Sequence, residues 1–307
     1  MPIYLGIDGG GTQTTCAVAD DAGVLATATA GASNMVRVGE HEARSNLREA
    51  ITKACEAAGV KPESVEAAVI GIAGASVPPV KQMVVSMIED LVPSEIDVVG
   101  DMVIAMEAAF AGLPGIVVIA GTGSVAFGRN EKGESGRAGG WGHAISDEGS
   151  GYWIGRSAVS AVMRALDAAD VTTLLRVILD AWNLESIEQL LQKANSYPPP
   201  DFPSLFPGIE AAASAGDKVA QDLLVRAGSE LARLASIIIG RLWQDERAVR
   251  VALGGGVFAH SPLVRRAFWS RLRAERPQAA VNFQIIYPVA GALWMARRLA
   301  ADAKIRS

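Results

Sequence analysis

The sequence contains few of the residues that bind metals or form covalent cross-links. Only two cysteines, Cys16 and Cys55, and three histidines occur among its 307 residues. Two cysteines cannot build a disulfide framework, and this set leaves no Cys/His metal cluster within the chain. We therefore expect a protein of a reducing compartment, the cytoplasm.

An excess of positive charge is also lacking, and so is a long apolar run. The chain has 28 Lys and Arg against 33 Asp and Glu, so its net charge is −5. Such a chain does not attract nucleic acid or an anionic membrane, although a local basic patch stays open. The one long uncharged stretch, residues 108–128, contains five glycines and a proline and is expected to be buried strand. The first residues lack the basic segment of a signal peptide.

The apolar segments that are present repeat one order twice, βββαβαβα. In the first half, strands are expected at 3–7, 16–19, 24–29, 67–72 and 96–99, and helices at 42–59, 80–91 and 102–112. In the second half, strands are expected at 116–120, 125–128, 249–253 and 281–287, and helices between 151 and 194, at 217–243, at 263–275 and from 289, with a proline-rich loop at 197–207. This predicts an α/β protein of two lobes, residues 1–114 and 115–288, with an interlobe cleft where ligands bind. The C-terminal helix, 289–307, can return to the first lobe.

A glycine-rich stretch between the first two strands is the first candidate site. In Asp8-Gly9-Gly10-Gly11-Thr12 the glycines allow positive φ and let backbone N–H groups approach an anion. Asp8, Thr12 and Thr14 add a carboxylate and two hydroxyls, which suit a phosphate that carries Mg²⁺. A plain glycine-rich β-turn is the alternative.

Two further glycine runs occupy equivalent places in the second half. Gly121-Thr122-Gly123-Ser124 follows a strand, and Gly254-Gly255-Gly256 ends a strand and opens a helix, where an anion or a flat ring can approach. No Walker-type loop and no Gly-x-Ser-x-Gly elbow occurs. Residues 121–126 match a dinucleotide fingerprint, but a strand end and a turn follow where that motif needs a helix. Three such runs at strand ends favour nucleotide phosphate binding.

The three glycine runs resemble the two phosphate motifs and the adenosine motif of the sugar kinase, actin and heat-shock chaperone superfamily. Gly139-Gly140-Trp141-Gly142-His143, followed by Ser146-Asp147-Glu148-Gly149-Ser150, is most similar to the branch of N-acetylglucosamine kinases and bacterial glucosamine kinases. This branch is grouped with ATPases that activate hydroxyacyl-CoA dehydratases, in the BadF/BadG/BcrA/BcrD ATPase family. The resemblance extends over essentially the whole chain and implies two ribonuclease H-like, actin-like ATPase lobes.

The resemblance also implies roles for single residues. It assigns ATP to Gly10, Gly11, Thr12, Gly121, Thr122, Gly123, Gly255 and Gly256; the sugar to Asn34, Asp101, Ser124, Gly140, Trp141, Gly142 and Asp147; and Mg²⁺, through water, to Asp8. Asp101 is the expected catalytic residue, which orients the sugar hydroxyl and accepts its proton.

Each of the distinctive side chains also has a purely structural interpretation. Asp101 or Asp147 could only cap a helix, Asn34 could mark a turn, and Trp141 could belong to the core.

The sequence thus predicts an ATP- and Mg²⁺-dependent kinase that phosphorylates the 6-hydroxyl of N-acetylglucosamine or glucosamine. Two rivals stay open: an ATPase that activates a 2-hydroxyacyl-CoA dehydratase and uses cysteines to hold an iron–sulphur cluster between subunits, and a sugar sensor without catalysis. The resemblance further implies a homodimer.

Overall fold

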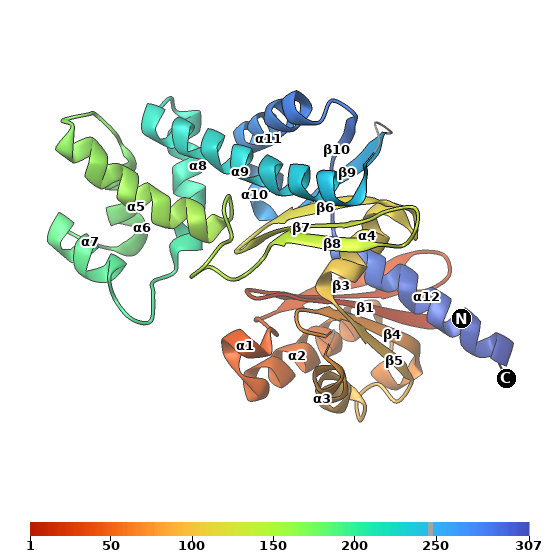
Figure 1. Cartoon of the computed structure of the whole chain (residues 1–307). Helices are drawn as coiled ribbons and strands as arrows, with labels where there is room; N and C mark the ends of the chain where they lie inside the picture. Colours follow the sequence, from red (N-terminus) through yellow and green to blue (C-terminus); the bar gives the residue numbers. More distant parts are fainter. Residues whose placement is uncertain (76, 245–247, 307) are drawn as a thin grey trace. The chain divides into compact units, whose positions relative to one another are not determined.

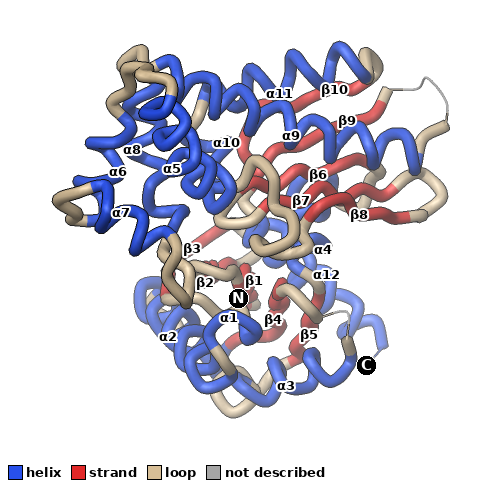
Figure 2. The backbone as a smooth tube through the Cα atoms, turned by 60° about the vertical axis from the view of Figure 1, so that its left-hand side comes forward, coloured by secondary structure: helices blue, strands red, loops and turns tan. Residues whose placement is uncertain are grey.

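The computed structural model describes residues 1–75, 77–244 and 248–306 of the chain. The chain divides into two compact units, Met1–Leu113 with Ile286–Ser307, and Pro114–Ile285. Each unit is an α/β structure built on one mixed five-stranded sheet (Figures 1 and 2).

In the first unit, a β-hairpin and a third strand come first, and strands and helices then alternate in the predicted order. Its elements are β1 (Ile3–Gly9), β2 (Thr14–Ala19), β3 (Val24–Ala30), α1 (Met35–Val38), α2 (Glu40–Ala58), the 3₁₀ helix η1 (Pro62–Ser64), β4 (Val65–Ile72), α3 (Pro78–Ile88), β5 (Glu95–Val99), α4 (Asp101–Phe110) and the returning α12 (Pro288–Arg306). The strand order is β3-β2-β1-β4-β5, with β1–β2 and β2–β3 antiparallel and β1–β4 and β4–β5 parallel. Residue 307, the last of the predicted C-terminal helix, lies outside the described residues.

Alternation along β1 places one helical layer on each face of this sheet. Leu5 and Ile7 lie in a core with residues of α2 and α3, whereas Tyr4 lies in a second core with residues of α4 and α12. Neighbouring side chains of a strand point to opposite faces, so a strand buried on both sides is apolar throughout. The parallel strands β1, β4 and β5 all end at one edge of the sheet, and there the glycine hairpin and Asp101 follow them.

The second unit has the same sheet topology and a larger helical part. Its elements are β6 (Gly115–Ala120), β7 (Ser124–Arg129), β8 (Ser135–Gly139), α5 (Gly151–Asp167), α6 (Leu174–Trp182), α7 (Ile187–Ala194), the 3₁₀ helix η2 (Phe202–Leu205), α8 (Phe206–Ser214), α9 (Lys218–Leu242), β9 (Val249–Gly254), α10 (Gly256–His260), α11 (Pro262–Glu275) and β10 (Ala279–Ile286). The strand order is β10-β9-β6-β7-β8. The buried side of α9 packs in one core with β6, α5 and α11.

The proline-rich stretch 197–207 differs from its prediction as a loop. It contains η2 and the start of α8, with a proline at the first or second position of each helix. Proline suits the first helical turn because its missing N–H would have no intrahelical partner there.

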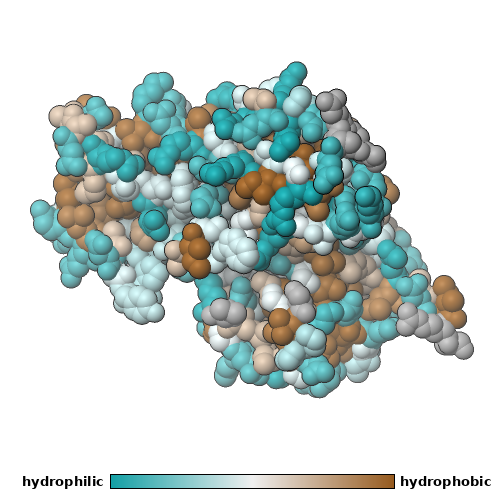
Figure 3. All heavy atoms as spheres, in the orientation of Figure 1, coloured by the Kyte–Doolittle hydropathy of each residue, from teal (hydrophilic) through white to brown (hydrophobic). Residues whose placement is uncertain are grey.

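Hydrophilic and apolar side chains are intermixed over the face shown in Figure 3. Within the described ranges, no helix combines the length and apolar character needed to cross a membrane.

Candidate active site

The first glycine stretch forms a tight hairpin between β1 and β2, as predicted. Gly9 pairs with Thr14, and the N–H of Gly10 donates to the carbonyl oxygen of Gln13 at 3.0 Å. The segment after β3 lies against this hairpin, because the N–H groups of Ser33 and Asn34 both donate to the carbonyl oxygen of Gly10, at 3.1 and 3.3 Å. Gly10 and the predicted sugar residue Asn34 are therefore part of one hydrogen-bonded structure.

Lack of space for a Cβ, rather than backbone conformation, explains Gly9 and Gly10 of this hairpin. None of Gly9, Gly10 and Gly11 has a positive φ, contrary to the expected use of that conformation. A Cβ on Gly9 would lie 2.7 Å from Ser33 Oγ, and one on Gly10 would lie 2.7 Å from the Gln13 carbonyl oxygen. At Gly11 the nearest such contact is ordinary, 3.7 Å to Arg37 Nη1, so a ligand can approach there.

Thr14 is not available to a phosphate, so this part of the prediction is wrong. Its side chain is fully buried, and Oγ1 makes hydrogen bonds with the Gly31 carbonyl oxygen at 2.7 Å and with Ser33 Oγ at 2.8 Å. Thr12 is exposed and stays a candidate. Ser33 was not among the predicted residues, because its partners lie about twenty residues away in sequence and no local pattern reveals them.

Two carboxylates lie at the same edge of the first sheet. Asp8 is the last residue but one of β1 and pairs with Gly71 of β4, and Asp101 follows β5. Desolvation by burial, with the negative charge of Asp101 adding to it, raises the pKa of Asp8 to about 6. Two carboxylates that affect each other in this way attract a cation, and a cation in turn favours their ionised forms.

The interpretation of Asp101 as a mere N-cap does not fit the helix. Gly100 occupies the N-cap position of α4, and Asp101 is the first helical residue. Its Oδ1 accepts the N–H of Met102 at 3.0 Å, and a carboxylate is stabilised in a first helical turn by the helix dipole. The side chain is half-buried, so it can reach a ligand at the sheet edge.

The second glycine stretch forms a shorter hairpin between β6 and β7. Ala120 pairs with Ser124, and the Gly121 N–H donates to the Gly123 carbonyl oxygen at 2.9 Å. The third run lies directly beside this hairpin, since Gly254 pairs with Ile119 and a Cβ on Gly255 would lie 2.4 Å from the Ala120 carbonyl oxygen. Gly255 also has φ +91°, which glycine adopts without strain. Gly256 begins α10, a helix of five residues.

The loop from Gly139 to Gly151 is attached to this second hairpin through a buried carboxylate. Asp147 accepts the backbone N–H groups of Ser124 and Gly142, and desolvation by burial raises its pKa although these bonds oppose the shift. Ser124 Oγ donates to the Glu148 carbonyl oxygen at 2.8 Å. Ser150, not Asp147, is the N-cap of α5, so a helix-capping role for Asp147 is ruled out.

Trp141 stands out from this loop and does not belong to a core. Its side chain is 63% exposed, and the Arg137 guanidinium lies over the indole ring, 4.2 Å from its centroid. Gly140 and Gly142 on either side have positive φ, at 68° and 94°. This arrangement presents a flat apolar surface of the kind on which the face of a sugar packs.

The predicted residues thus form two groups, one in each unit. The first contains Asp8, Gly10, Gly11, Thr12, Asn34 and Asp101, and the second contains Gly121, Thr122, Gly123, Ser124, Gly140, Trp141, Gly142, Asp147, Gly255 and Gly256. The two cysteines are in neither group, because Cys16 and Cys55 are buried in the core of the first unit. Their burial argues against a cluster shared between subunits, the central feature of the dehydratase-activator rival.

Comparison with known proteins identifies the relatives of the chain. The family model of the BadF/BadG/BcrA/BcrD ATPase family matches residues 5–293. An N-acetylmuramic acid/N-acetylglucosamine kinase of Clostridium acetobutylicum is 33% identical over 92% of this chain and 94% of its own length. An N-acetyl-D-glucosamine kinase of Dictyostelium discoideum is 30% identical over 96% of this chain and 97% of its own.

A solved structure has the same two-lobed fold. A protein of Chromobacterium violaceum described as a candidate N-acetylglucosamine kinase superposes with a TM-score of 0.74, at 25% identity over 96% of this chain and 99% of its own. The predicted α/β fold of two actin-like ATPase lobes is therefore confirmed. The chain belongs to the BadF/BadG/BcrA/BcrD ATPase family.

Proposed function

We propose that the chain transfers the γ-phosphoryl group of ATP to the 6-hydroxyl of an amino sugar, N-acetylglucosamine or glucosamine, in one in-line step. Its relatives are named sugar kinases, and the chain is an ATP-dependent carbohydrate kinase. The name of the Clostridium acetobutylicum relative adds N-acetylmuramic acid to the sugars to be tested.

The observation that carries the proposal is the pair of interacting carboxylates beside the first glycine hairpin. Asp101 accepts the proton of the 6-hydroxyl. At the same time the oxygen of that hydroxyl forms a bond to the γ-phosphorus, and the bond from this phosphorus to the β–γ bridging oxygen breaks, so that ADP leaves. A loose transition state asks for a well-placed nucleophile more than for a strong base, so an ordinary carboxylate suffices. The backbone N–H of Asn34 donates to the Gly10 carbonyl oxygen. In this proposal the Asn34 side chain hydrogen-bonds the sugar.

The residues around Asp8 fit a magnesium ion that arrives with ATP. No group of three or more acidic, histidine or cysteine side chains suited to a metal occurs among the described residues. Mg²⁺ commonly keeps several waters and takes only one or two carboxylates, the rest coming from phosphates. Asp8 would hold it through water, and the ion would neutralise charge that develops on the phosphates.

The second group of residues holds the two substrates in place. Gly121, Thr122 and Gly123 bind phosphates, and Gly255 and Gly256, next to that hairpin, face the adenosine. Asp147, Ser124 and the Gly140–Gly142 backbone hydrogen-bond sugar hydroxyls, and Trp141 packs on the sugar. Burial of Asp147 in the loop gives these contacts a fixed geometry, which lowers the entropy lost on binding.

The test is ADP release with glucosamine, N-acetylglucosamine, N-acetylmuramic acid, N-acetylmannosamine and glucose, followed by NMR of the phosphorylated carbon. We expect phosphorylation at O6 of an amino sugar, and Asp101→Asn should lower kcat by about 10²–10⁴-fold with the sugar affinity nearly unchanged. An Asp101→Asn variant with full turnover would refute the catalytic assignment. Sugar binding without ADP formation would favour the sensor.

The homodimer stays a prediction, which sedimentation of the purified protein at several concentrations will test.

A further inference from the structure

Arg37 lies next to the first glycine hairpin and has no role in the function proposed above. It is the third residue of α1, and its N–H donates to the Asn34 carbonyl oxygen at 2.9 Å. Asn34 in turn donates to Gly10, so α1 is tied to the hairpin by consecutive backbone hydrogen bonds. The position of Arg37 relative to the hairpin is therefore fixed by the main chain.

The side chain of Arg37 extends along Gly11. A Cβ on Gly11 would lie 3.7 Å from Arg37 Nη1 and 3.9 Å from its Cδ. The residue is exposed, so its charge is still hydrated. A phosphate that binds the N–H groups at Gly11 would arrive within reach of a guanidinium, which presents paired N–H donors to phosphate oxygens.

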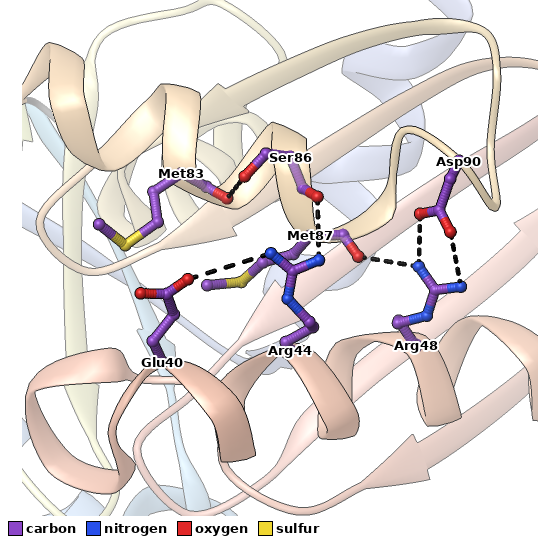
Figure 4. Close-up of polar contacts among 7 residues, drawn as sticks. All are labelled: Glu40, Arg44, Arg48, Met83, Ser86, Met87 and Asp90. Carbon is purple, nitrogen blue, oxygen red and sulfur yellow. Dashed lines mark hydrogen bonds and ion pairs between the residues drawn. The ribbon is translucent and has the colours of Figure 1, made fainter.

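Two other arginines nearby show what a purely structural arginine looks like in this unit (Figure 4). Arg44 and Arg48 of α2 donate to the carbonyl oxygens of Ser86 and Met87 at the end of α3, at 3.1 and 3.0 Å. Arg48 also forms a two-point ion pair with Asp90, at 2.6 and 3.1 Å. The guanidinium of Arg37 makes no hydrogen bond or ion pair with any part of the chain that the structure describes.

We propose that Arg37 is a further catalytic residue, which contacts the transferred phosphoryl group at the first hairpin. The inference rests on the proposed function, because it assumes that the hairpin binds ATP. Charge in the transition state is spread over the three equatorial oxygens of the phosphoryl group, where an arginine stabilises it.

The experiment compares Arg37→Ala, Arg37→Lys and wild type in the full-length protein. Arg37→Ala should lower kcat/KM for ATP by about 10²-fold or more, with KM for the sugar changed less than threefold. Arg37→Lys should recover part of the loss, because it restores the charge without the planar donors. Added guanidinium at millimolar concentration should partly restore the turnover of Arg37→Ala and leave wild type unchanged. The Arg37→Ala substitution should weaken the binding of a non-hydrolysable ATP analogue more than the binding of ADP.

Arg44→Ala is the matched control, since it removes an arginine of the same region that serves α3. It should lower Tm and keep the kcat of wild type. Arg37→Ala with the kcat/KM of wild type and an unchanged ratio of ATP-analogue to ADP affinity would overturn the inference. So would a loss of activity that comes with a lowered Tm and no rescue by guanidinium, because that marks a structural role. If wild type phosphorylates none of the sugars, the proposed function fails instead.

Discussion

Each unit has a glycine hairpin between its first two strands, and the two hairpins are held in place by different means. The Gly10 carbonyl oxygen accepts two N–H groups from the segment after β3, and the buried side chains of Thr14 and Ser33 are hydrogen-bonded to each other. In the second unit, the first turn of α5 holds the hairpin, because the Gly151 N–H donates to Gly121 at 2.8 Å and the Tyr152 N–H donates to Thr122 at 3.3 Å.

The carboxylates near the two hairpins, Asp8 in the first unit and Asp147 in the second, also have different surroundings. Asp147 accepts backbone N–H groups of its own unit, which oppose the rise of its pKa, whereas burial and the negative charge of Asp101 both raise the pKa of Asp8. Under the proposed function, the first hairpin would therefore serve the metal and the reacting phosphoryl group, and the second would hold the substrates. The following variants test this division of roles.

Among the variants that compare the two hairpins, Asp8→Asn is expected to have the largest effect. Activity at neutral pH should fall by about 10–100-fold, which is the usual effect of removing a residue that holds a metal indirectly, through a bound water or through another ligand of the metal. Because the raised pKa favours the protonated form, Asp8 contributes stability below the pKa of the unfolded chain, near 4, and that contribution is lost as pH rises through about 6.

The metal-free Asp8→Asn variant should therefore have a higher Tm than wild type at pH 8 and a similar one at pH 4. In wild type the Mg²⁺ concentration needed for half-maximal rate should rise as pH falls below about 6. A flat Mg²⁺ requirement between pH 5 and 8 would contradict the assignment of Asp8.

The pair Gly10→Ala and Gly121→Ala separates space needed by the fold from space needed by the ligand. Gly10→Ala forces a Cβ to 2.7 Å from a carbonyl oxygen and should cost about 1–3 kcal/mol of unfolding free energy. A Cβ on Gly121 meets no atom of the described chain within 4 Å, so Gly121→Ala should keep stability within about 0.5 kcal/mol.

Gly121→Ala should nevertheless raise KM for ATP by about tenfold, because a displaced phosphate loses its alignment. Chemical denaturation measures the free energy of unfolding of both variants, and steady-state kinetics measures their KM for ATP. A Gly121→Ala variant with the KM of wild type would mean that no phosphate approaches this residue.

Thr14→Val tests the support of the first hairpin without touching a ligand. It leaves the Gly31 carbonyl oxygen and Ser33 Oγ without the partner that they have now, which should cost about 1–2 kcal/mol. We expect a higher KM for the sugar, since Asn34 follows Ser33, and Val18→Ala in the same strand serves as a core control that changes stability alone. Equal KM values for both variants would show that the two segments are not coupled.

The smallest effect is expected from Arg137→Ala. An exposed cation–π contact is worth about 0.5–1 kcal/mol, so KM for the sugar should rise about two- to fivefold through a less ordered Trp141. Arg273→Ala, which removes the same kind of contact from Trp269 on α11, should leave KM unchanged. Intrinsic tryptophan fluorescence on sugar addition measures the ordering directly.

Strands and long helices could be predicted because their signals are local. Helix α9 was expected at 217–243 and spans Lys218–Leu242, with Asp217 as its N-cap, where Oδ1 accepts the Ala220 N–H at 3.0 Å. Helix α3 spans Pro78–Ile88 instead of the predicted 80–91, because prolines start the helix and the apolar pattern alone does not mark its end.

The residues of the candidate site could be proposed from the sequence, but the contacts among them could not. Trp141 and Asp101 follow from motifs, while the exposure of Trp141 depends on how the loop folds. The use of Thr14 by Ser33 and the position of Arg37 depend on chain segments brought together by the sheet, and no spacing rule contains that information. Glycine is equally ambiguous, since the same residue type serves positive φ at Gly255 and close approach at Gly10.

The two hydrogen bonds accepted by the Gly10 carbonyl oxygen have a consequence for how the two substrates affect each other's binding. They join the first glycine hairpin to the Asn34 segment, so a ligand that orders one of them should lower the entropic cost of ordering the other. We expect ATP and sugar to increase each other's affinity by the same factor, as thermodynamic linkage requires. Under the proposed function, an empty sugar site would leave the hairpin less ordered around ATP, which would limit the transfer of phosphate to water.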